Sequence, residues 1–264
     1  MSSSPSSMLA HIVAILDCFT MDQTELGVRE VARKADLTTS TAGRLMADMK
    51  EFGILQQNST TRMYSLGMKI LAWSGIYLSS LDLRTIALPI MGDLRRLTSE
   101  TVSLYLVDGN ERLCVERIES QHNLRMVARV GHRLPLYAGS AGKAILAFMP
   151  LARVDQILKT TEFKPLTPMT IVDPEVLKLD LDRIRLKGYA ESHGEWIQEA
   201  SGVAAPILGQ GGEVVGALSI SGPGSRFTPM RVREYAAEVV RAAGQLSKSM
   251  GYIEERNQPI GEIS

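Results

Sequence analysis

Four consecutive hydroxyl side chains, followed by an arginine, form the first group in the sequence that could make specific hydrogen bonds to another molecule. Thr38-Thr39-Ser40-Thr41 precedes an apolar segment with helical periodicity, and Arg44 lies one turn into that segment. Hydroxyls at a helix start accept hydrogen bonds from the free backbone N–H groups there. Such residues also contact phosphates and base edges of DNA, and arginine can bond a guanine edge through two hydrogen bonds. The pattern therefore favours either a helix cap or a DNA-contacting surface.

A second candidate site contains small and hydroxylated residues. Ser219 and Ser221 alternate within a predicted strand, so both hydroxyls face the same side. Ser140-Ala141-Gly142 lacks bulk, which lets backbone N–H groups approach a carboxylate closely. Gly142-Lys143-Ala144 is predicted to open a helix, whose N-terminus favours an anion. A solvated strand edge for the serines and a tight turn for the glycine-rich segment remain as alternatives.

The segments around the hydroxyl run have the order of a winged helix-turn-helix. Apolar spacing predicts a helix from Met8 to Phe19, a short helix near Val28, a helix from the hydroxyl run to Gly53, and short strands at Ile54–Gln57 and Met63–Leu66 with a polar tip between them. In that fold the second helix of the pair enters the major groove. The candidate DNA contacts are therefore Thr38, Thr39, Ser40, Thr41 and Arg44, with Arg62 at the wing tip.

Composition limits the class of protein. The chain has 264 residues and a formal net charge of zero, which argues against coating nucleic acid by bulk charge. Seven basic and four acidic residues between Arg29 and Lys69 give that stretch a modest net charge of +3. No apolar run approaches the ~18 residues of a membrane span, and the Ser-rich start does not resemble a signal peptide. Only Cys18 and Cys114 are present, which fits a reducing compartment. We expect a cytoplasmic protein.

The remainder of the chain predicts an α+β domain with a mainly antiparallel sheet. Residues 68–88 have helical spacing and are interpreted as a linker helix or a broken pair of helices. Strands are predicted at 101–107, 112–118, 124–130, 203–208 and 214–221, and helices at 84–97, 173–187 and 230–250. This divides the chain into a winged helix-turn-helix domain, residues 1–75, and a linker helix with a second domain, residues 76–264.

Patterns typical of catalysis are incomplete. Gly139–Lys143 has part of a phosphate-binding loop, but Tyr137 and Ala144 stand where that motif requires Gly and Ser or Thr. The four histidines are scattered, neither cysteine has metal-ligand spacing, and no Gly-x-Ser-x-Gly elbow is present. The sequence therefore predicts no enzyme, no metal site and no cofactor.

Residues 26–67 resemble the DNA-binding domain of the IclR family of bacterial transcriptional regulators. The resemblance rests on Leu37, Ser40-Thr41, Arg44-Leu45, Gly53 and Tyr64-Ser65-Leu66-Gly67. Three further motifs, at 131–147, 188–207 and 216–223, are similar to the same family and extend the likeness over nearly the whole chain. The second of these departs from the family, because Ser192 stands where Asp is frequent and Gly202 where Cys, Ser or Ala is usual.

The resemblance implies a GAF-like effector-binding domain that holds a small organic or aromatic acid beside its sheet. The implied pocket residues are Met126, Ser140, Ala141, Ser192, Gly202, Ser219 and Ser221, with Trp196 as an apolar wall. Ser192 and Gly202 would leave more room and less charge than the usual residues, which predicts a bulkier or more neutral-ended acid.

The expected partners are double-stranded operator DNA, a carboxylate effector and a second copy of the chain, with pairing of dimers as a further possibility. The function predicted is a DNA-binding regulator, either a repressor or an activator, whose operator binding the effector changes. Winged helices also dock on proteins. A small-molecule sensor that acts through protein contacts instead of DNA is therefore the alternative.

Overall fold

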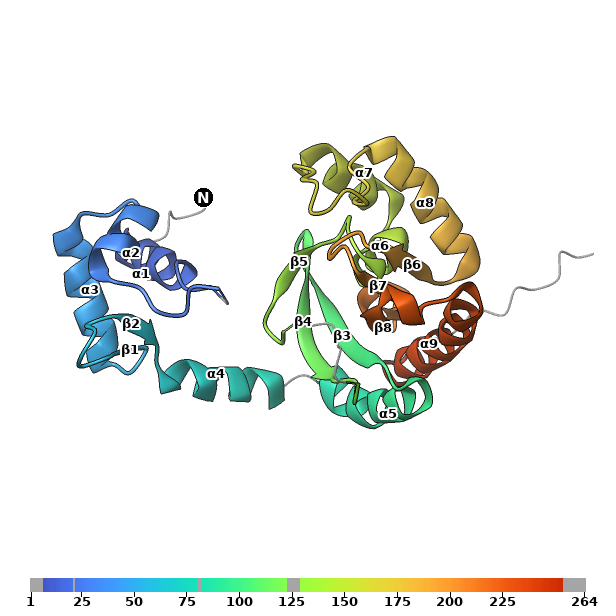
Figure 1. The fold of residues 1–264 in the computed structure, drawn as a ribbon, viewed down its shortest axis with the longest axis horizontal. Coiled ribbons are helices and arrows are strands. Elements are labelled where there is room, and N and C mark those ends of the chain that lie inside the picture. Colours follow the sequence, from blue (N-terminus) through green and yellow to red (C-terminus); the bar gives the residue numbers. More distant parts are fainter. Residues whose placement is uncertain (1–6, 21, 80–81, 123–128, 254–264) are drawn as a thin grey trace, which may run out of the picture. The chain divides into compact units, whose positions relative to one another are not determined.

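The computed structural model describes residues 7–20, 22–79, 82–122 and 129–253. They belong to two units, residues 1–80 and 81–264 (Figure 1). The elements of the first unit are α1 (Ser7–Asp17), α2 (Val28–Lys34), α3 (Thr39–Glu51), β1 (Leu55–Gln57), β2 (Tyr64–Leu66) and α4 (Met68–Ser79). Three helices followed by an antiparallel pair of short strands confirm the predicted winged helix-turn-helix.

The core of the first unit explains why its helices have apolar residues at three- and four-residue steps. Ile15 of α1, Val31 of α2 and Met46 of α3 are fully buried against one another and against Leu55 of β1. Leu26 forms an isolated bridge with Tyr64, which fastens the chain between α1 and α2 to the wing. The three helices and the wing thus share one small core.

Glycine fixes the start of α4. A Cβ at Gly67 would lie 2.3 Å from the carbonyl oxygen of Gly53, so no larger residue fits where the end of the wing crosses the end of α3. Gly53 has a φ of 72°, a conformation that glycine adopts without strain. The glycine of the Tyr-Ser-Leu-Gly motif is therefore required by close backbone packing.

The second unit is built around a six-stranded sheet in which every neighbouring pair is antiparallel. Its strands are β3 (Thr101–Asp108), β4 (Glu111–Ile118), β5 (Arg133–Pro135), β6 (Ala190–His193), β7 (Ala200–Leu208) and β8 (Val214–Pro223), and their order across the sheet is β5-β4-β3-β8-β7-β6. Its helices are α5 (Asp82–Thr98), α6 (Ser140–Ala147), α7 (Leu151–Thr160), α8 (Pro174–Lys187) and α9 (Pro229–Ser249). This confirms the predicted α+β class.

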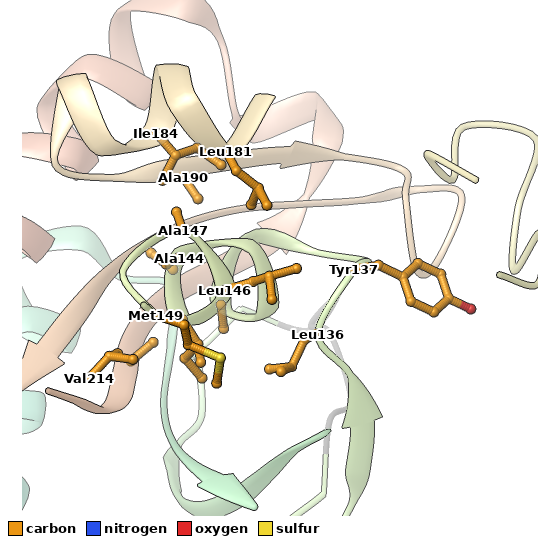
Figure 2. Packing of buried hydrophobic residues seen from close by; sticks show 14 of the residues in the cluster. Leu136, Tyr137, Ala144, Leu146, Ala147, Met149, Leu181, Ile184, Ala190 and Val214 are labelled. Atoms are coloured by element: carbon orange, nitrogen blue, oxygen red, sulfur yellow. The ribbon is translucent and has the colours of Figure 1, made fainter. Parts of the chain in front are cut away.

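Two helical layers cover the two faces of this sheet (Figure 1). α5 and α9 bury one apolar cluster against one face, and α6, α7 and α8 bury another against the opposite face. Figure 2 shows Ala144, Leu146 and Ala147 of α6 in the second cluster, with Leu181 and Ile184 of α8 beside them. All eight residues of α6 are buried. α6 is therefore a core helix, and its first turn lies next to the sheet.

Some predicted elements differ from those observed. The strand predicted at 124–130 falls mostly outside the described residues, and Arg129 and Val130 are not in a strand. β5 was not predicted, because a three-residue strand that ends in proline has too short a pattern. The helix predicted at 84–97 is observed as α5, with Pro89 inside it. The buried side chains of Leu83 and Met91 on either side of Pro89 anchor both halves of the helix. None of the described helices has the length and apolar character needed to span a membrane.

Candidate functional site

The first turns of α3 present the predicted DNA-contacting residues on an exposed face. Thr38, Thr39, Ser40 and Arg44 are exposed and Thr41 is half-buried, whereas Leu45, Met46 and Met49 on the other side of the helix are buried. Thr38 is the N-cap, and its hydroxyl accepts a hydrogen bond from the backbone N–H of Thr41 at 3.1 Å. Thr38 therefore serves as a helix cap, while Thr39, Ser40 and Arg44 have side chains open to a partner.

The wing tip is ordered by one asparagine. The side-chain oxygen of Asn58 accepts hydrogen bonds from the backbone N–H groups of Thr60 and Thr61 at 2.9 and 3.1 Å. Arg62 follows with a φ of 60° and an exposed side chain. A rigid turn of this kind holds the arginine at the end of the wing, where it can meet a DNA backbone or groove.

In the second unit, six of the seven predicted effector residues line one cavity. Ser140, Ala141, Ser192, Gly202, Ser219 and Ser221 all contribute to its wall, as does Trp196. The seventh, Met126, lies outside the described residues. The cavity encloses about 70 Å³, room for several water molecules. Residues that were not predicted complete the wall, namely Tyr105, Arg112, Gly139, Ile197, Ala200 and Ser201.

The serines of β8 lie in the middle of the sheet. Ser219 pairs with Ser103 of β3 on one side and Ala204 of β7 on the other, and Ser221 pairs with Gly202. Ser219 is 3% exposed. The alternative of a solvated strand edge is therefore wrong, and both hydroxyls face the cavity wall from the same side of one strand.

A buried ion cluster stands at the start of α6. The Nζ of Lys143 lies 2.6 Å from Oε1 of Glu195 and 2.8 Å from Oδ2 of Asp180. The other carboxylate oxygen of Glu195 accepts a hydrogen bond from the backbone N–H of Gly139 at 2.9 Å. Lys143 and Glu195 are 3% and 7% exposed. The chain thus supplies its own anion to the N-cap of this helix, and the favourable position there is already occupied.

Arg112 is the charged residue that sequence reasoning missed. It lies in β4 with 3% exposure, its Nη1 donates a hydrogen bond to the carbonyl of Pro135, and its guanidinium carbon lies 5.4 Å from the centre of the Tyr105 ring. Burial lowers the pKa of Arg112 and raises the pKa of Tyr105 to about 12. An arginine just after a turn resembles a solvent-facing residue. The one signal that Arg112 points inward is its spacing of two residues from Cys114, which is buried on the same face of the strand.

Arg112 also changes the explanation of the glycine-rich segment. A Cβ at Gly142 would lie 2.2 Å from Nη1 of Arg112 and 2.5 Å from the carbonyl oxygen of Leu136. Gly142 therefore makes room for the guanidinium, and not for a ligand as the sequence suggested. The expectation of a tight turn alone is also wrong, because α6 begins at Ser140.

The predicted gain in room and loss of charge are both corrected by these positions. A Cβ at Gly202 would lie 2.9 Å from the hydroxyl oxygen of Ser140, so Ser140 already fills the space that the glycine leaves. Arg112 places a buried guanidinium in the wall, so the cavity is not poor in charge. The guanidinium of Arg112 thus gives one side of the cavity a positive charge, and Ser140 takes up the space beside Gly202.

A short loop closes part of the cavity. The hydroxyl of Thr170 donates to the carbonyl oxygen of Glu195 at 2.7 Å, and the hydroxyl of Thr167 donates to the carbonyl oxygen of Gly194. Trp196 packs edge-on against His132, with ring centres 5.7 Å apart. The backbone of residues 194–196 is therefore held in place by side chains from outside the sheet. Among the described residues no three His, Cys, Asp or Glu side chains gather as metal ligands.

A winged helix-turn-helix followed by an α+β domain with a small cavity is the architecture of DNA-binding transcriptional regulators that carry a second, separate domain. Residues 9–59 match the family model of the IclR helix-turn-helix domain, and residues 75–248 match that of the bacterial transcriptional regulator IclR C-terminal domain. The chain belongs to the IclR family of transcriptional regulators.

Relatives that cover most of the chain agree with this assignment. The chain is 36% identical over 231 residues to the HTH-type transcriptional regulator KdgR of Escherichia coli K12, covering 88% of each protein. It is 32% identical to KipR of Bacillus subtilis, covering 91% of this chain and 95% of that protein.

Solved structures of IclR-type regulators have the same fold. The Thermotoga maritima IclR structure is 33% identical, with a TM-score of 0.74 over 92% of this chain and 98% of that one. An IclR homologue from Microbacterium hydrocarbonoxydans, solved in complex with 4-hydroxybenzoate, is 30% identical, with a TM-score of 0.78 over 92% of this chain and 100% of that one.

Proposed function

We propose that this regulator binds a pseudopalindromic operator as a homodimer or a dimer of dimers, and that a carboxylic acid in the cavity of the second unit changes its affinity for DNA. The observation that carries the proposal is the convergence of six predicted effector residues on one cavity. The relative that binds 4-hydroxybenzoate supports a small acid as ligand. Regulation of this kind needs no catalysis, and it takes place in the cytoplasm, where bacterial DNA lies.

Exposed apolar side chains support the homodimer. In α4, Met68, Leu71, Trp73 and Ile76 are exposed. Apolar groups that remain in water on a helix favour burial against another surface. A second copy of the same helix, related by a two-fold axis, provides such a surface and pairs two DNA-binding units for two half-sites.

The proposed DNA contacts are Thr38, Thr39, Ser40, Thr41, Arg44 and Arg62. We expect Arg44→Ala to weaken operator binding by about 1–3 kcal/mol if the guanidinium bonds a base edge. Binding is measured by fluorescence anisotropy on operator and on random DNA at several salt concentrations. Lys50→Ala, at the far end of the same helix, is the matched control. An equal loss on both DNAs would mean that Arg44 contacts phosphate only, and absence of DNA binding even at low salt would favour docking on a protein.

The proposed effector site is tested by removing the two hydroxyls of β8. We expect Ser219→Ala with Ser221→Ala to weaken carboxylate binding while leaving DNA affinity unchanged, because both residues belong to the second unit and α3 belongs to the first. The measurement is the thermal shift of the purified protein against a panel of aliphatic and aromatic carboxylates, since a ligand of the native state raises the midpoint. Ser249→Ala, on the exposed end of α9, is the control. An unchanged shift in the double variant would contradict the assignment.

Effector and DNA must influence each other equally. If the acid changes operator affinity by some factor, the operator changes acid affinity by the same factor, because the two equilibria share one thermodynamic cycle. Titrating the acid with and without operator DNA therefore checks that the cavity and the winged helix belong to one regulatory device.

A further inference from the structure

Arg112 is a buried cation whose guanidinium is only partly hydrogen-bonded. Its Nη1 is bonded to the carbonyl of Pro135, which carries no net charge, and its Nε has no hydrogen-bond partner. Within the part of the chain that the structure describes, Arg112 forms no ion pair, although it is only 3% exposed. Transfer of a charged group from water to a protein interior without an opposite charge is strongly unfavourable. An anion at this position would therefore be bound favourably.

The chain's own carboxylates nearby are already committed. Glu195 is held by Lys143 and by the backbone of Gly139, and Asp180 is held by Lys143. The electrostatic attraction of Glu195 raises the pKa of Arg112, but no hydrogen bond joins the two side chains. Residues 123–128, which lie outside the described ranges, contain no Asp or Glu. Among the described residues, no carboxylate oxygen is therefore hydrogen-bonded to the guanidinium of Arg112, which leaves N–H donors for a ligand.

Four further polar side chains of the cavity are serine hydroxyls without hydrogen-bond partners among the described residues. They belong to Ser140, Ser192, Ser219 and Ser221. All four residues line the same cavity as Arg112. Ser201 differs, since its hydroxyl lies 3.1 Å from Nδ1 of His193. Hydroxyls both donate and accept, so they suit a ligand that carries hydroxyl or keto oxygens.

The size of the cavity separates two classes of acid. A cavity of about 150 Å³ lined by apolar side chains is known to hold one benzene ring. The cavity here encloses about 70 Å³. A short aliphatic acid has fewer non-hydrogen atoms than an aromatic acid and therefore suits this volume better.

We propose that Arg112 binds the carboxylate of the effector, and that the effector is a short aliphatic acid whose hydroxyl or keto oxygens bond to the four serines. This inference rests on the proposed function and adds to it the anchoring residue and the class of ligand. The ring of Tyr105 packs against the guanidinium of Arg112, and Gly142 leaves the space that the guanidinium occupies.

The test measures binding of D-glycerate, pyruvate, glycerol and benzoate to the full-length protein by isothermal titration calorimetry. We expect at least one of the two aliphatic acids to bind more tightly than benzoate, and glycerol, which has no carboxylate, to bind at least tenfold more weakly. Arg112→Gln should weaken binding of the aliphatic acid by about 30-fold or more, because a charge-assisted hydrogen bond is lost. Arg133→Gln, the same change on β5 in an exposed arginine paired with Asp108, should leave it unchanged.

Each result with the Arg112 variants either supports the proposed role of Arg112 or overturns it. Arg112→Lys keeps the charge but loses the planar fork, and an intermediate loss is expected. Operator binding and circular dichroism verify that the variants fold. Failure of both variants to fold would assign Arg112 a structural role and overturn the proposal. Binding within threefold of the unchanged protein in Arg112→Gln would overturn it too, as would tighter binding of benzoate or no binding of either aliphatic acid.

The same experiment distinguishes failure of the role of Arg112 from failure of the proposed function. If Ser219→Ala with Ser221→Ala loses the acid while Arg112→Gln retains it, the cavity stands as the effector site and the role of Arg112 fails. If neither set of variants affects binding of an acid, the acid binds elsewhere and the proposed effector site fails as well. Operator binding measured without ligand tests the DNA-binding half on its own.

Discussion

Glu195→Ala is expected to destabilise the second unit by about 3–5 kcal/mol, because it leaves the buried ammonium of Lys143 with one partly exposed partner, Asp180. The backbone N–H of Gly139 also loses its acceptor. The measurement is denaturant unfolding of the full chain, followed by Trp196 fluorescence in a Trp73→Phe background, because Trp73 lies in the first unit. Because the chain has two units, their transitions are fitted separately.

Two comparisons make this first result decisive. Glu191→Ala removes the same side chain from an exposed pair with Lys187 and should change stability by less than about 1 kcal/mol. Lys143→Met combined with Glu195→Leu removes both charges and should recover much of the loss, since apolar pairs replace buried ion pairs well. Equal effects of Glu195→Ala and Glu191→Ala would contradict the role of the buried cluster.

Gly142→Ala is expected to destabilise the second unit by about 3 kcal/mol, near the upper end of what one added methyl group does in a packed core. The new Cβ would meet both Nη1 of Arg112 and the carbonyl oxygen of Leu136 at less than 3 Å. The guanidinium could move, but the backbone carbonyl could not, so the start of α6 must shift. Thermal and denaturant unfolding measure the loss.

A glycine in open space is the control for this second prediction. Gly244 lies within α9, and a Cβ there would meet no atom within 4 Å. Gly244→Ala should therefore stabilise the protein by about 0.5–1 kcal/mol through the better helix propensity of alanine. A Gly142→Ala variant as stable as the unchanged protein would mean that the packing of Arg112 under α6 is not as tight as the structure shows.

The first unit was largely predictable because its features are local. Thr38 caps the helix that begins at the next residue, Gly53 ends it, and the two short strands follow within a dozen residues. Each feature is determined by neighbours close in sequence, which is the kind of information that residue spacing contains. The same holds for Ser219 and Ser221, whose shared face follows from strand alternation alone.

The charged part of the cavity was not predictable, since its contacts join residues far apart in the chain. Lys143 pairs with Glu195, which lies 52 residues further along the chain, and Gly142 of α6 packs against Arg112 of β4. Nothing in the local pattern distinguishes an inward arginine from an outward one next to a turn. Glu195 lies within the motif at 188–207, and only the fold shows that its carboxylate accepts a hydrogen bond from the N-cap residue of α6.

The loop over the cavity has a consequence for how such regulators change over evolutionary time. Its backbone is fixed by Thr167 and Thr170 from one side and by the carboxylate of Glu195 from the other. The side chains of Trp196 and Ile197, which line the cavity, take no part in these hydrogen bonds, although the Trp196 ring also packs against His132. Mutation at these two positions can therefore reshape the ligand space while the sheet and α6 stay intact, so a new metabolite can be recruited as a signal through few substitutions.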